Sequence, residues 1–359
     1  MRWPRALAER LGIEHPIIQA PMAGGPSTPE LAAAVSNAGG LGSLAGGYSP
    51  PAIIREQIRA TRALTTRPFQ VNLFVPEPPR SAPSHEEIER AQRAVAPFRA
   101  EVGLAEPGTP GPFPPFAEQL RVVLEERVPV FSFTFGALPA EDVQALSRAG
   151  LVVLGTATTV REARALEAAG VHAIVAQGGD AGAHRGTFLG PPEHGLTGTL
   201  ALVPQLADAV ALPIVAAGGI MDGRGIAAAL ALGARGVQLG TAFVPSPESG
   251  ASRAHKDALL ARADDDRTTL TRAFSGKPAR ALRNRFIEEM EGAPVLPFPL
   301  QNAMTADLRR EAAKAGKSDL LSLWAGQGAP LVRTRPAGEL VRDLVRETEE
   351  VFARLERGD

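Results

Sequence analysis

The chain has 359 residues, of which 44% are hydrophobic and 21% are charged, and its formal net charge is −1. This composition supplies apolar surface for a large core but no excess charge for a polyanion, so we expect no nucleic acid as a partner. Every apolar run is far shorter than the roughly 20 residues that span a bilayer, and the first residues carry no export signal. We therefore expect a cytoplasmic protein that does not bind membranes.

The absence of cysteine from the chain excludes disulfides, thiolate metal sites and a cysteine nucleophile. The six histidines show no close pairing with the spacing of metal ligands, so we expect no metal ion. Redox chemistry in this protein would therefore need an organic cofactor.

Short β-rich runs alternate with helical stretches along the chain, which is typical of βα units and a parallel sheet. The expected strands are 16–20, 41–45, 69–74, 128–133, 151–154, 172–176, 213–217 and 236–239. The expected helices between them include 28–37, 52–63, 140–149, 159–169, 199–209 and 224–232. The first of these helices has Ser27 or Thr28 as its N-cap, Pro29 and Glu30 in its first turn, and Gly39 after its end.

Eight near-evenly spaced units favour closure into a (β/α)₈ barrel, the TIM barrel, with one insertion. A doubly wound sheet has the same alternation of strands and helices and stays an alternative, as do two unrelated domains. Proline-rich passages at 75–83 and 107–115 surround a charged helix at 86–98. Because proline removes backbone donors, we expect an irregular excursion after the third strand.

The βα rhythm stops after the eighth strand. Residues 245–331 contain helical pieces and an acidic run at 264–266, so we expect a mostly helical cap over the barrel mouth. A charged amphipathic helix at 337–355 is expected to serve as the eighth outer helix. The predicted domains are therefore a barrel at 1–244, completed by a helix within 332–359, and a cap at 245–331.

Glycine-rich corners follow the first, seventh and eighth expected strands, with the sequences QAPMAGG (19–25), AAGGI (216–220) and QLGT (238–241). Loops after strands seven and eight of such a barrel often bind phosphate, because backbone N–H groups and a helix N-terminus meet the anion there. Tight turns that simply need glycine are the alternative for each single corner. The pair of corners favours a phosphate site.

The sixth corner, QGGDAGAHRG (177–186), has four glycines beside His184 and Arg185. We expect a flexible loop around a ligand, in which the imidazole moves a proton or, as a cation, stabilises an anion. A solvated histidine that caps a turn is the alternative. His172, inside the sixth strand, is expected to be a hydrogen-bonded core residue, and the other histidines carry no motif.

These segments together resemble the class I nitronate monooxygenases, also called 2-nitropropane dioxygenases. The similar blocks are PIIQAPMAGGPSTPELAAAVSNAGGLGSLAGGY, PFQVNLF, AQGGDAGAHRGTF and PIVAAGGIMDGRGIAAALALGARGVQLGTAF, followed by FSGKPAR and PFPLQNAM. AVSNAGGLG alone is shared with relatives that reduce enoyl thioesters or quinones. The resemblance implies an FMN-dependent enzyme on a TIM barrel that oxidises alkyl nitronates, such as propionate 3-nitronate, with O₂ to carbonyl compounds and nitrogen oxides.

Two other functions stay open at this point. One is an NAD(P)H-dependent flavin reductase of enoyl thioesters or quinones on the same fold, and the other is a flavin-binding protein without activity. The sequence does not disclose the oligomeric state.

The resemblance also implies a role for individual residues. Pro21, Met22, Ala23 and Gly24 would lie against the flavin, and Asn72 would hydrogen-bond it. Gln177 and Gly182 would contact the flavin and its ribityl chain. The phosphate cradle would consist of Gly218, Gly219, Gln238, Leu239, Gly240 and Thr241.

His184 is the catalytic residue that the resemblance implies, and with Arg185 it is expected to attract the nitronate anion. Family members often have tyrosines around the substrate, whereas this chain has a single tyrosine, Tyr48. We expect Phe133, Phe135 and Phe298 to take those places.

Overall fold

The computed structural model describes residues 3–77, 82–105, 107, 113–261 and 268–358, so the acidic run at 264–266 and most of the proline-rich residues at 78–81 and 106–112 lie outside them. Eight parallel strands form a barrel in the order β1-β9-β8-β6-β5-β4-β3-β2. A parallel bridge between Ile18 and Leu41 joins the two ends of this series. The strands are β1 (Ile17–Gln19), β2 (Gly42–Ala45), β3 (Phe69–Phe74), β4 (Val130–Thr134), β5 (Val152–Ala157), β6 (Ala173–Gln177), β8 (Ile214–Ala217) and β9 (Gly236–Leu239).

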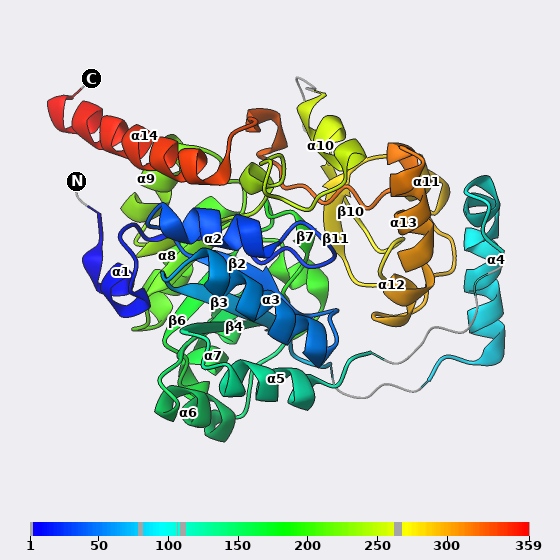
Figure 1. Ribbon diagram of the computed structural model, residues 1–359, viewed down its shortest axis with the longest axis horizontal. Helices are drawn as coiled ribbons and strands as arrows, with labels where there is room; N and C mark the ends of the chain where they lie inside the picture. The colour runs from blue at the N-terminus through cyan, green and yellow to red at the C-terminus, as the bar shows by residue number, and fades with distance from the viewer. Residues whose placement is uncertain (1–2, 78–81, 106, 108–112, 262–267, 359) are drawn as a thin grey trace.

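The fold is therefore the predicted (β/α)₈ barrel and not a doubly wound sheet (Figure 1). All eight expected strands are present, with ends displaced by a few residues. No helix in the described ranges is both long and apolar enough to cross a bilayer.

The outer layer of the barrel consists of α-helices that follow the strands in turn. They are α2 (Pro29–Asn37), α3 (Pro51–Leu64), α5 (Phe116–Glu125), α6 (Ala140–Arg148), α7 (Val160–Ala169), α8 (Thr199–Ala209), α9 (Gly223–Ala231) and α14 (Ala337–Arg357). Helix α14 packs against α9 and α2, which is the position expected of the eighth outer helix. Helix α5 lies between the excursion and β4 and was not among the predicted elements.

The start of α2 shows how the first corner is held. Thr28 is the N-cap, because its Oγ1 accepts a hydrogen bond from Leu31 N at 3.0 Å. Ser27 has another role, since its Oγ accepts from Met22 N at 2.9 Å and from Gln19 Nε2 at 3.1 Å. Thr28 therefore caps the helix, and Ser27 stabilises the turn that follows β1.

Each barrel strand is buried on both faces. Alternate residues such as Ile17, Phe131 and Ile174 belong to the core between strands and helices, whereas Ile18, Val130 and Val175 belong to a second core inside the barrel. This alternation is the period of two of a strand. The inner core also includes Leu7 and Leu11 of α1 (Arg5–Leu11), an unpredicted helix that therefore closes one end of the barrel.

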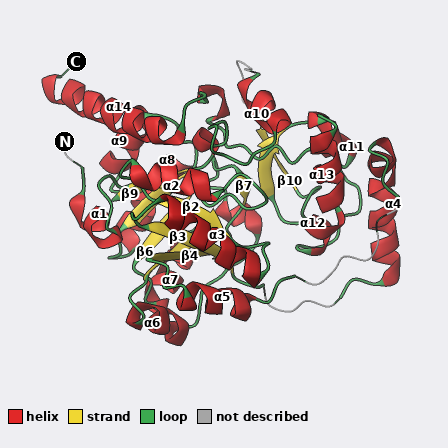
Figure 2. Ribbon diagram, viewed as in Figure 1, coloured by secondary structure: helices red, strands yellow, loops and turns green. Residues whose placement is uncertain are grey.

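The regular structure of the cap is mostly helical, as expected, and it also contains two short strands. Its helices are α10 (Arg253–Leu260), α11 (Arg285–Glu289), α12 (Leu300–Met304) and α13 (Ala306–Lys314). Two antiparallel strands, β10 (Thr268–Thr271) and β11 (Ala279–Leu282), pair with each other, and β11 pairs with β7 (Ala183–His184). Figure 2 shows β10, in yellow, among the cap helices. The cap is thus attached by backbone hydrogen bonds to the sixth corner of the barrel.

The excursion after β3 also packs on the cap. Its helix α4 (His85–Glu101) lies beside α11 and α13, away from the barrel (Figure 1). Phe98 of α4 contacts Phe286 with ring centroids 4.7 Å apart, and Phe286 stacks on Phe274 at 4.4 Å. Both Phe274 and Phe286 are fully buried. The cap core is therefore built from two segments that are far apart in the chain.

Truncation of this aromatic cluster is expected to destabilise the cap. Replacement of Phe286 by alanine should lower the free energy of unfolding by about 3–5 kcal/mol, because a large buried ring is lost and a cavity forms. Leu200→Ala is the control, since Leu200 is 71% exposed, and it should change stability by less than about 0.5 kcal/mol. Urea unfolding followed by circular dichroism measures both, and equal effects would contradict the proposed core.

Candidate active site

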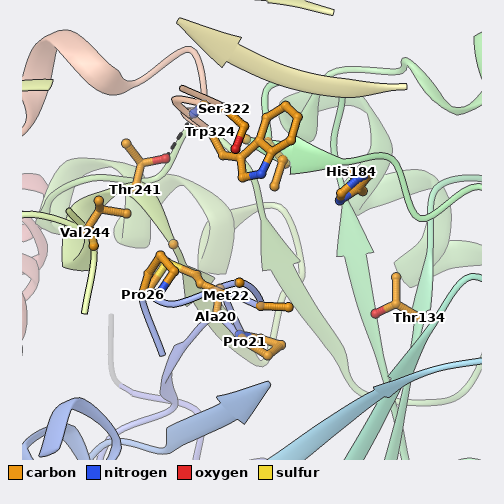
Figure 3. Close-up of a pocket in the computed structure, with 18 of the residues that line it drawn as sticks. Ala20, Pro21, Met22, Pro26, Thr134, His184, Thr241, Val244, Ser322 and Trp324 are labelled. Atoms are coloured by element: carbon orange, nitrogen blue, oxygen red, sulfur yellow. Dashed lines mark hydrogen bonds between the residues drawn. The ribbon is translucent and has the colours of Figure 1, made fainter. Parts of the chain in front are cut away.

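A cavity of about 650 Å³ opens at the carboxyl ends of the barrel strands, between the barrel and the cap. Figure 3 shows its walls: Trp324 and His184 on the cap side, the turn with Pro21 and Met22 opposite, and Thr134 and Thr241 on either side. The thirteen residues expected to bind the cofactor and the expected catalytic residue all line it, namely Pro21, Met22, Ala23, Gly24, Asn72, Gln177, Gly182, His184, Gly218, Gly219, Gln238, Leu239, Gly240 and Thr241. The corners therefore converge as predicted, while their individual roles stay predictions.

The wall formed by β3, β4 and β5 is polar. Asn72 donates from Nδ2 to Ser132 Oγ at 3.0 Å and lies 3.5 Å from Thr134 Oγ1. Thr134 Oγ1 is in turn 3.4 Å from Thr156 Oγ1. This network fixes the orientation of the Asn72 amide, whose Oδ1 is left to accept a hydrogen bond from a ligand.

The sixth corner is braced on both sides, so the expectation of a flexible loop is wrong. Gln177 donates from Nε2 to His184 O at 3.0 Å, and its Oε1 accepts from Gly186 N at 2.7 Å. Pairing of β7 with β11 places Ala279 opposite His184. The Gln177 side chain therefore positions the histidine segment, and one N–H of its amide remains for a ligand.

Arg185 does not reach the cavity, which corrects the expectation that it attracts an anion. Its guanidinium is fully buried and donates to Gly178 O and Gln177 O at 2.8 Å each, and to Gly195 O at 3.1 Å. Burial lowers the pKa of Arg185 to about 10, so the group is still charged at pH 7. Three carbonyl groups thus hold this cation behind the loop that carries His184.

The corners after β8 and β9 present backbone donors. Within the described residues, no hydrogen bond uses the N–H groups of Gly218, Gly219, Gly240 or Thr241. The N-terminus of α9 is different, because the carboxylate of Asp222 already accepts from Arg224 N at 2.9 Å and from Gly225 N at 3.3 Å. The donors available to an anion therefore come from the two loops. The N-terminus of α9, which had been expected to contribute, does not.

A cap segment that the sequence did not single out covers these corners. Gly326 N donates to Thr241 Oγ1 at 3.0 Å, a bond drawn in Figure 3. A Cβ atom on Gly182 would lie 2.6 Å from the backbone of Ala325 and Gly326, so only glycine permits this approach. The glycine of the sixth corner therefore serves the contact between barrel and cap.

His184 lies among aromatic rings. The centroids of Phe135, Phe298 and Trp324 are 5.9, 5.8 and 5.3 Å from that of the imidazole. Burial, together with the positive charges of Lys277 and Arg309, lowers the pKa of His184 to about 3. The imidazole is therefore neutral at pH 7 and does not attract an anion as a cation, contrary to that part of the expectation.

Several cavity residues had no signal in their own sequence context. Arg309 of α13 lines the cavity and donates only to Thr305 O, Asn302 O and Asn302 Oδ1 within the described chain. Tyr48 also lines it, and its buried hydroxyl has no partner there. Burial raises the pKa of Tyr48, while the nearby charge of Arg309 lowers it. The cap thus contributes a cation next to a free hydroxyl group.

The three phenylalanines expected around the substrate are divided. Phe135 lines the cavity and Phe298 packs against its wall, with ring centroids 5.7 Å apart. Phe133 does not line the cavity. It is fully buried in the core between strands and helices, beside Leu166 and Gly155. Phe74 takes part instead, at 4.6 Å from Phe135. The strand alternation sends Phe133 outwards.

Comparison with known proteins identifies the family of this chain. The sequence model of the family described as nitronate monooxygenase matches residues 5–347. A probable nitronate monooxygenase of Staphylococcus aureus (strain Newman) is 42% identical over 351 residues, which cover 96% of this chain and 98% of that protein. The crystal structure of a nitroalkane oxidase from Streptomyces ansochromogenes is 45% identical, with a TM-score of 0.90, and 98% of this chain and 99% of that one are covered. FabK from Thermotoga maritima is 32% identical with a TM-score of 0.74, over 100% of both chains.

A barrel enzyme with its site at the carboxyl ends of the strands is the class that the fold and the cavity define. The chain belongs to the nitronate monooxygenase family and is an oxidoreductase.

The two histidines that line the cavity predict a pH dependence of stability. Burial lowers the pKa of His255 to about 4 and that of His184 to about 3, whereas an unfolded histidine has a pKa of about 6.5. The unfolded chain therefore binds more protons, and the free energy of unfolding should fall as the pH drops below about 6.5, by at most about 1.4 kcal/mol per pH unit and histidine.

Urea unfolding at pH 7, 6 and 5 measures this slope. His255→Gln should flatten it, because glutamine can still donate to Trp324 O, as His255 Nε2 does at 3.2 Å, but does not titrate. His85→Gln should leave the slope unchanged, since the side chain of His85 is 89% exposed. A slope that is the same in all three proteins would show that the buried histidines do not cause it.

Proposed function

We propose that this protein is an FMN-dependent nitronate monooxygenase that oxidises alkyl nitronates, such as propionate 3-nitronate, with O₂ to carbonyl compounds and nitrogen oxides. The observation that carries the proposal is one cavity that holds both the free N–H groups of the β8 and β9 corners and a neutral His184. Its relatives by name, a probable nitronate monooxygenase and a nitroalkane oxidase, support the same reaction class.

The residues of the cavity fit FMN. Gly218, Gly219, Gly240 and Thr241 offer four backbone donors for one phosphate group, and the wall with Asn72 offers an amide for the edge of the flavin ring. About 650 Å³ is within the usual size of a cofactor site. When bound, the flavin would accept electrons from the substrate and transfer them to O₂.

The cap side of the cavity suits an anionic substrate. Arg309 supplies a positive charge in the cavity wall, and the Tyr48 hydroxyl, which has no partner among the described residues, supplies a donor beside it. The rings of Phe135, Phe298 and Trp324 around His184 exclude water and strengthen these interactions. We assign anion binding to Arg309 in place of Arg185, and its position suits a nitronate that carries a second negative charge, such as a carboxylate.

His184 would act on the proton of a neutral nitroalkane. Its neutral imidazole can accept a proton from the carbon next to the nitro group, which forms the nitronate inside the cavity. The cations near the ring oppose its protonation in the free enzyme, and the negative charge that develops on the substrate offsets them. A preformed nitronate does not need this step.

An NAD(P)H-dependent flavin reductase of enoyl thioesters or quinones is the second candidate, because FabK has a similar structure over the whole chain. Anaerobic mixing separates the two functions. Bleaching of the yellow protein by propionate 3-nitronate alone, followed by oxygen uptake on aeration, is the expected result. Bleaching by NADH and not by the nitronate would overturn the proposed function, and no bleaching by either would indicate a flavin-binding protein without activity.

Gly240→Val should weaken FMN binding at least 10-fold while the barrel still folds. A Cβ atom at Gly240 would lie 3.4 Å from Ala20 Cβ and 3.9 Å from Met22 Sδ, which are ordinary contacts, and its φ of −108° lies outside the left-handed region that favours glycine. The two methyl groups would therefore occupy cavity space without straining the backbone. Gly219 is a poorer choice, since its φ is +69° and its Cβ would meet Asp180.

Acid release and chromatography of the cofactor, with circular dichroism of the protein, measure this change. Gly338→Ala in α14 is the control, because it is remote from the cavity and should retain FMN. Stoichiometric FAD in the unmodified protein, or unchanged FMN content in the valine variant, would refute the assignment of the cradle.

His184→Asn should leave FMN bound and slow the oxidation of a neutral nitroalkane by about 10²–10⁴-fold, because asparagine cannot accept the proton. Oxidation of a preformed nitronate should fall much less. Steady-state oxygen uptake with both substrates measures the difference. Wild-type rates with both would mean that His184 takes no part in the reaction.

A further inference from the structure

The imidazole of His184 is the end of a chain of hydrogen bonds that runs into the cap. Its Nε2 lies 2.9 Å from Ser275 Oγ, and Ser275 Oγ donates to Lys277 O at 3.0 Å. Ser275 is fully buried, and Lys277 is 9% exposed. Both residues belong to the cap, so the hydrogen-bond partner of the imidazole ring is a cap hydroxyl group.

The direction of these hydrogen bonds follows from a count of donors. The serine hydroxyl has one hydrogen, and Lys277 O can only accept. In the described part of the chain, Ser275 Oγ is the donor found for Lys277 O. A buried carbonyl without a donor costs about 1–3 kcal/mol, so the hydroxyl hydrogen belongs to Lys277 O. His184 Nε2 must then carry a hydrogen and donate it to Ser275 Oγ.

The other ring nitrogen is thereby left with a free lone pair. No hydrogen bond from a described residue reaches Nδ1 of His184, and this atom is not among the buried polar atoms that lack a partner, so it is open to the cavity. A neutral imidazole with Nε2 protonated has its basic lone pair on Nδ1. The tautomer therefore decides whether the nitrogen that faces a substrate can accept a proton.

We propose that Ser275 is a positioning residue that, together with Lys277 O, holds His184 in the tautomer with Nε2 protonated and Nδ1 available as the base. The same β7 and β11 pairing that places Ala279 opposite His184 fixes the distance between the ring and this hydroxyl. The consequence of this role for turnover rests on the proposed function, whereas the tautomer itself does not.

Nitrogen NMR of protein labelled with ¹⁵N-histidine tests the tautomer directly. His184→Asn identifies the signals, because those of His184 disappear. At pH 7 the unmodified protein should show one protonated nitrogen, Nε2, and one unprotonated nitrogen, Nδ1. Ser275→Ala should give a mixture of tautomers or the reverse one, while Ser275→Thr, which retains the hydroxyl group, should keep the original one. An unchanged tautomer in Ser275→Ala would overturn the proposal.

Kinetics of the FMN-loaded proteins test the consequence. Ser275→Ala should lower kcat/KM for a neutral nitroalkane on the order of 10–100-fold, as loss of an orienting partner does in other sites, and lower it much less for a preformed nitronate. Ser275→Thr should restore most of the loss. Ser246→Ala is the matched control, because Ser246 has a buried hydroxyl group with no partner among the described residues.

Equal losses in the alanine and threonine variants, or with both substrates, would indicate a merely structural role and overturn the proposal. If the unmodified enzyme oxidises neither substrate, the proposed function fails, and the NMR spectra still decide the role of Ser275.

Discussion

The arrangement of the site depends on the burial of one charge, the guanidinium of Arg185. A buried cation is tolerated only when polar groups replace its water, and here the carbonyl oxygens of Gln177, Gly178 and Gly195 do so at 2.8–3.1 Å. Because the carbonyls of Gln177 and Gly178 belong to the corner itself, the same bonds that solvate the charge also fix the backbone of the loop. His184 precedes Arg185 directly, so its side chain points the other way, into the cavity. A glycine-rich segment thereby becomes a rigid support for an imidazole.

The barrel and the cap contribute different chemistry to the cavity. The barrel corners supply backbone N–H groups and the polar wall with Asn72, whereas the cap supplies Arg309, Trp324 and the hydroxyl group of Ser275. The two parts meet at backbone contacts, between β7 and β11 and between Gly182 and Gly326. His184 lies on this boundary, so its protonation depends on barrel and cap together: burial and the cap cations Lys277 and Arg309 set its pKa, and Ser275 sets its tautomer.

The sequence predicted the barrel well because strand periodicity and glycine punctuation are local signals. The eight strands, the N-cap of α2 at Ser27 or Thr28 and the convergence of the glycine corners followed from such signals and from the family resemblance. The errors involve contacts that form only in the folded chain. The three carbonyls around Arg185 come from residues 7, 8 and 10 positions away, which a turn brings back to it. The strand β7 forms only because β11, almost 100 residues later, pairs with it. Phe133 lies outside the cavity because the register of β4 turns it, like Phe131, towards the surrounding helices. Arg309 and Tyr48 approach each other only in the folded chain.

The attachment of the cap has a consequence for how this protein can evolve. The residues proposed to contact the substrate, apart from His184 and the rings of the barrel loops, lie in cap helices and loops that follow all eight strands in the chain. The backbone donors of β8 and β9 do not depend on the identity of those side chains, because glycine and threonine present them through the main chain. Mutations at positions such as Asn302, Arg309 or Trp324 can therefore alter which molecules enter the cavity while cofactor retention and barrel folding stay intact. Substitutions in a short stretch of sequence can therefore change the range of substrates that the enzyme accepts.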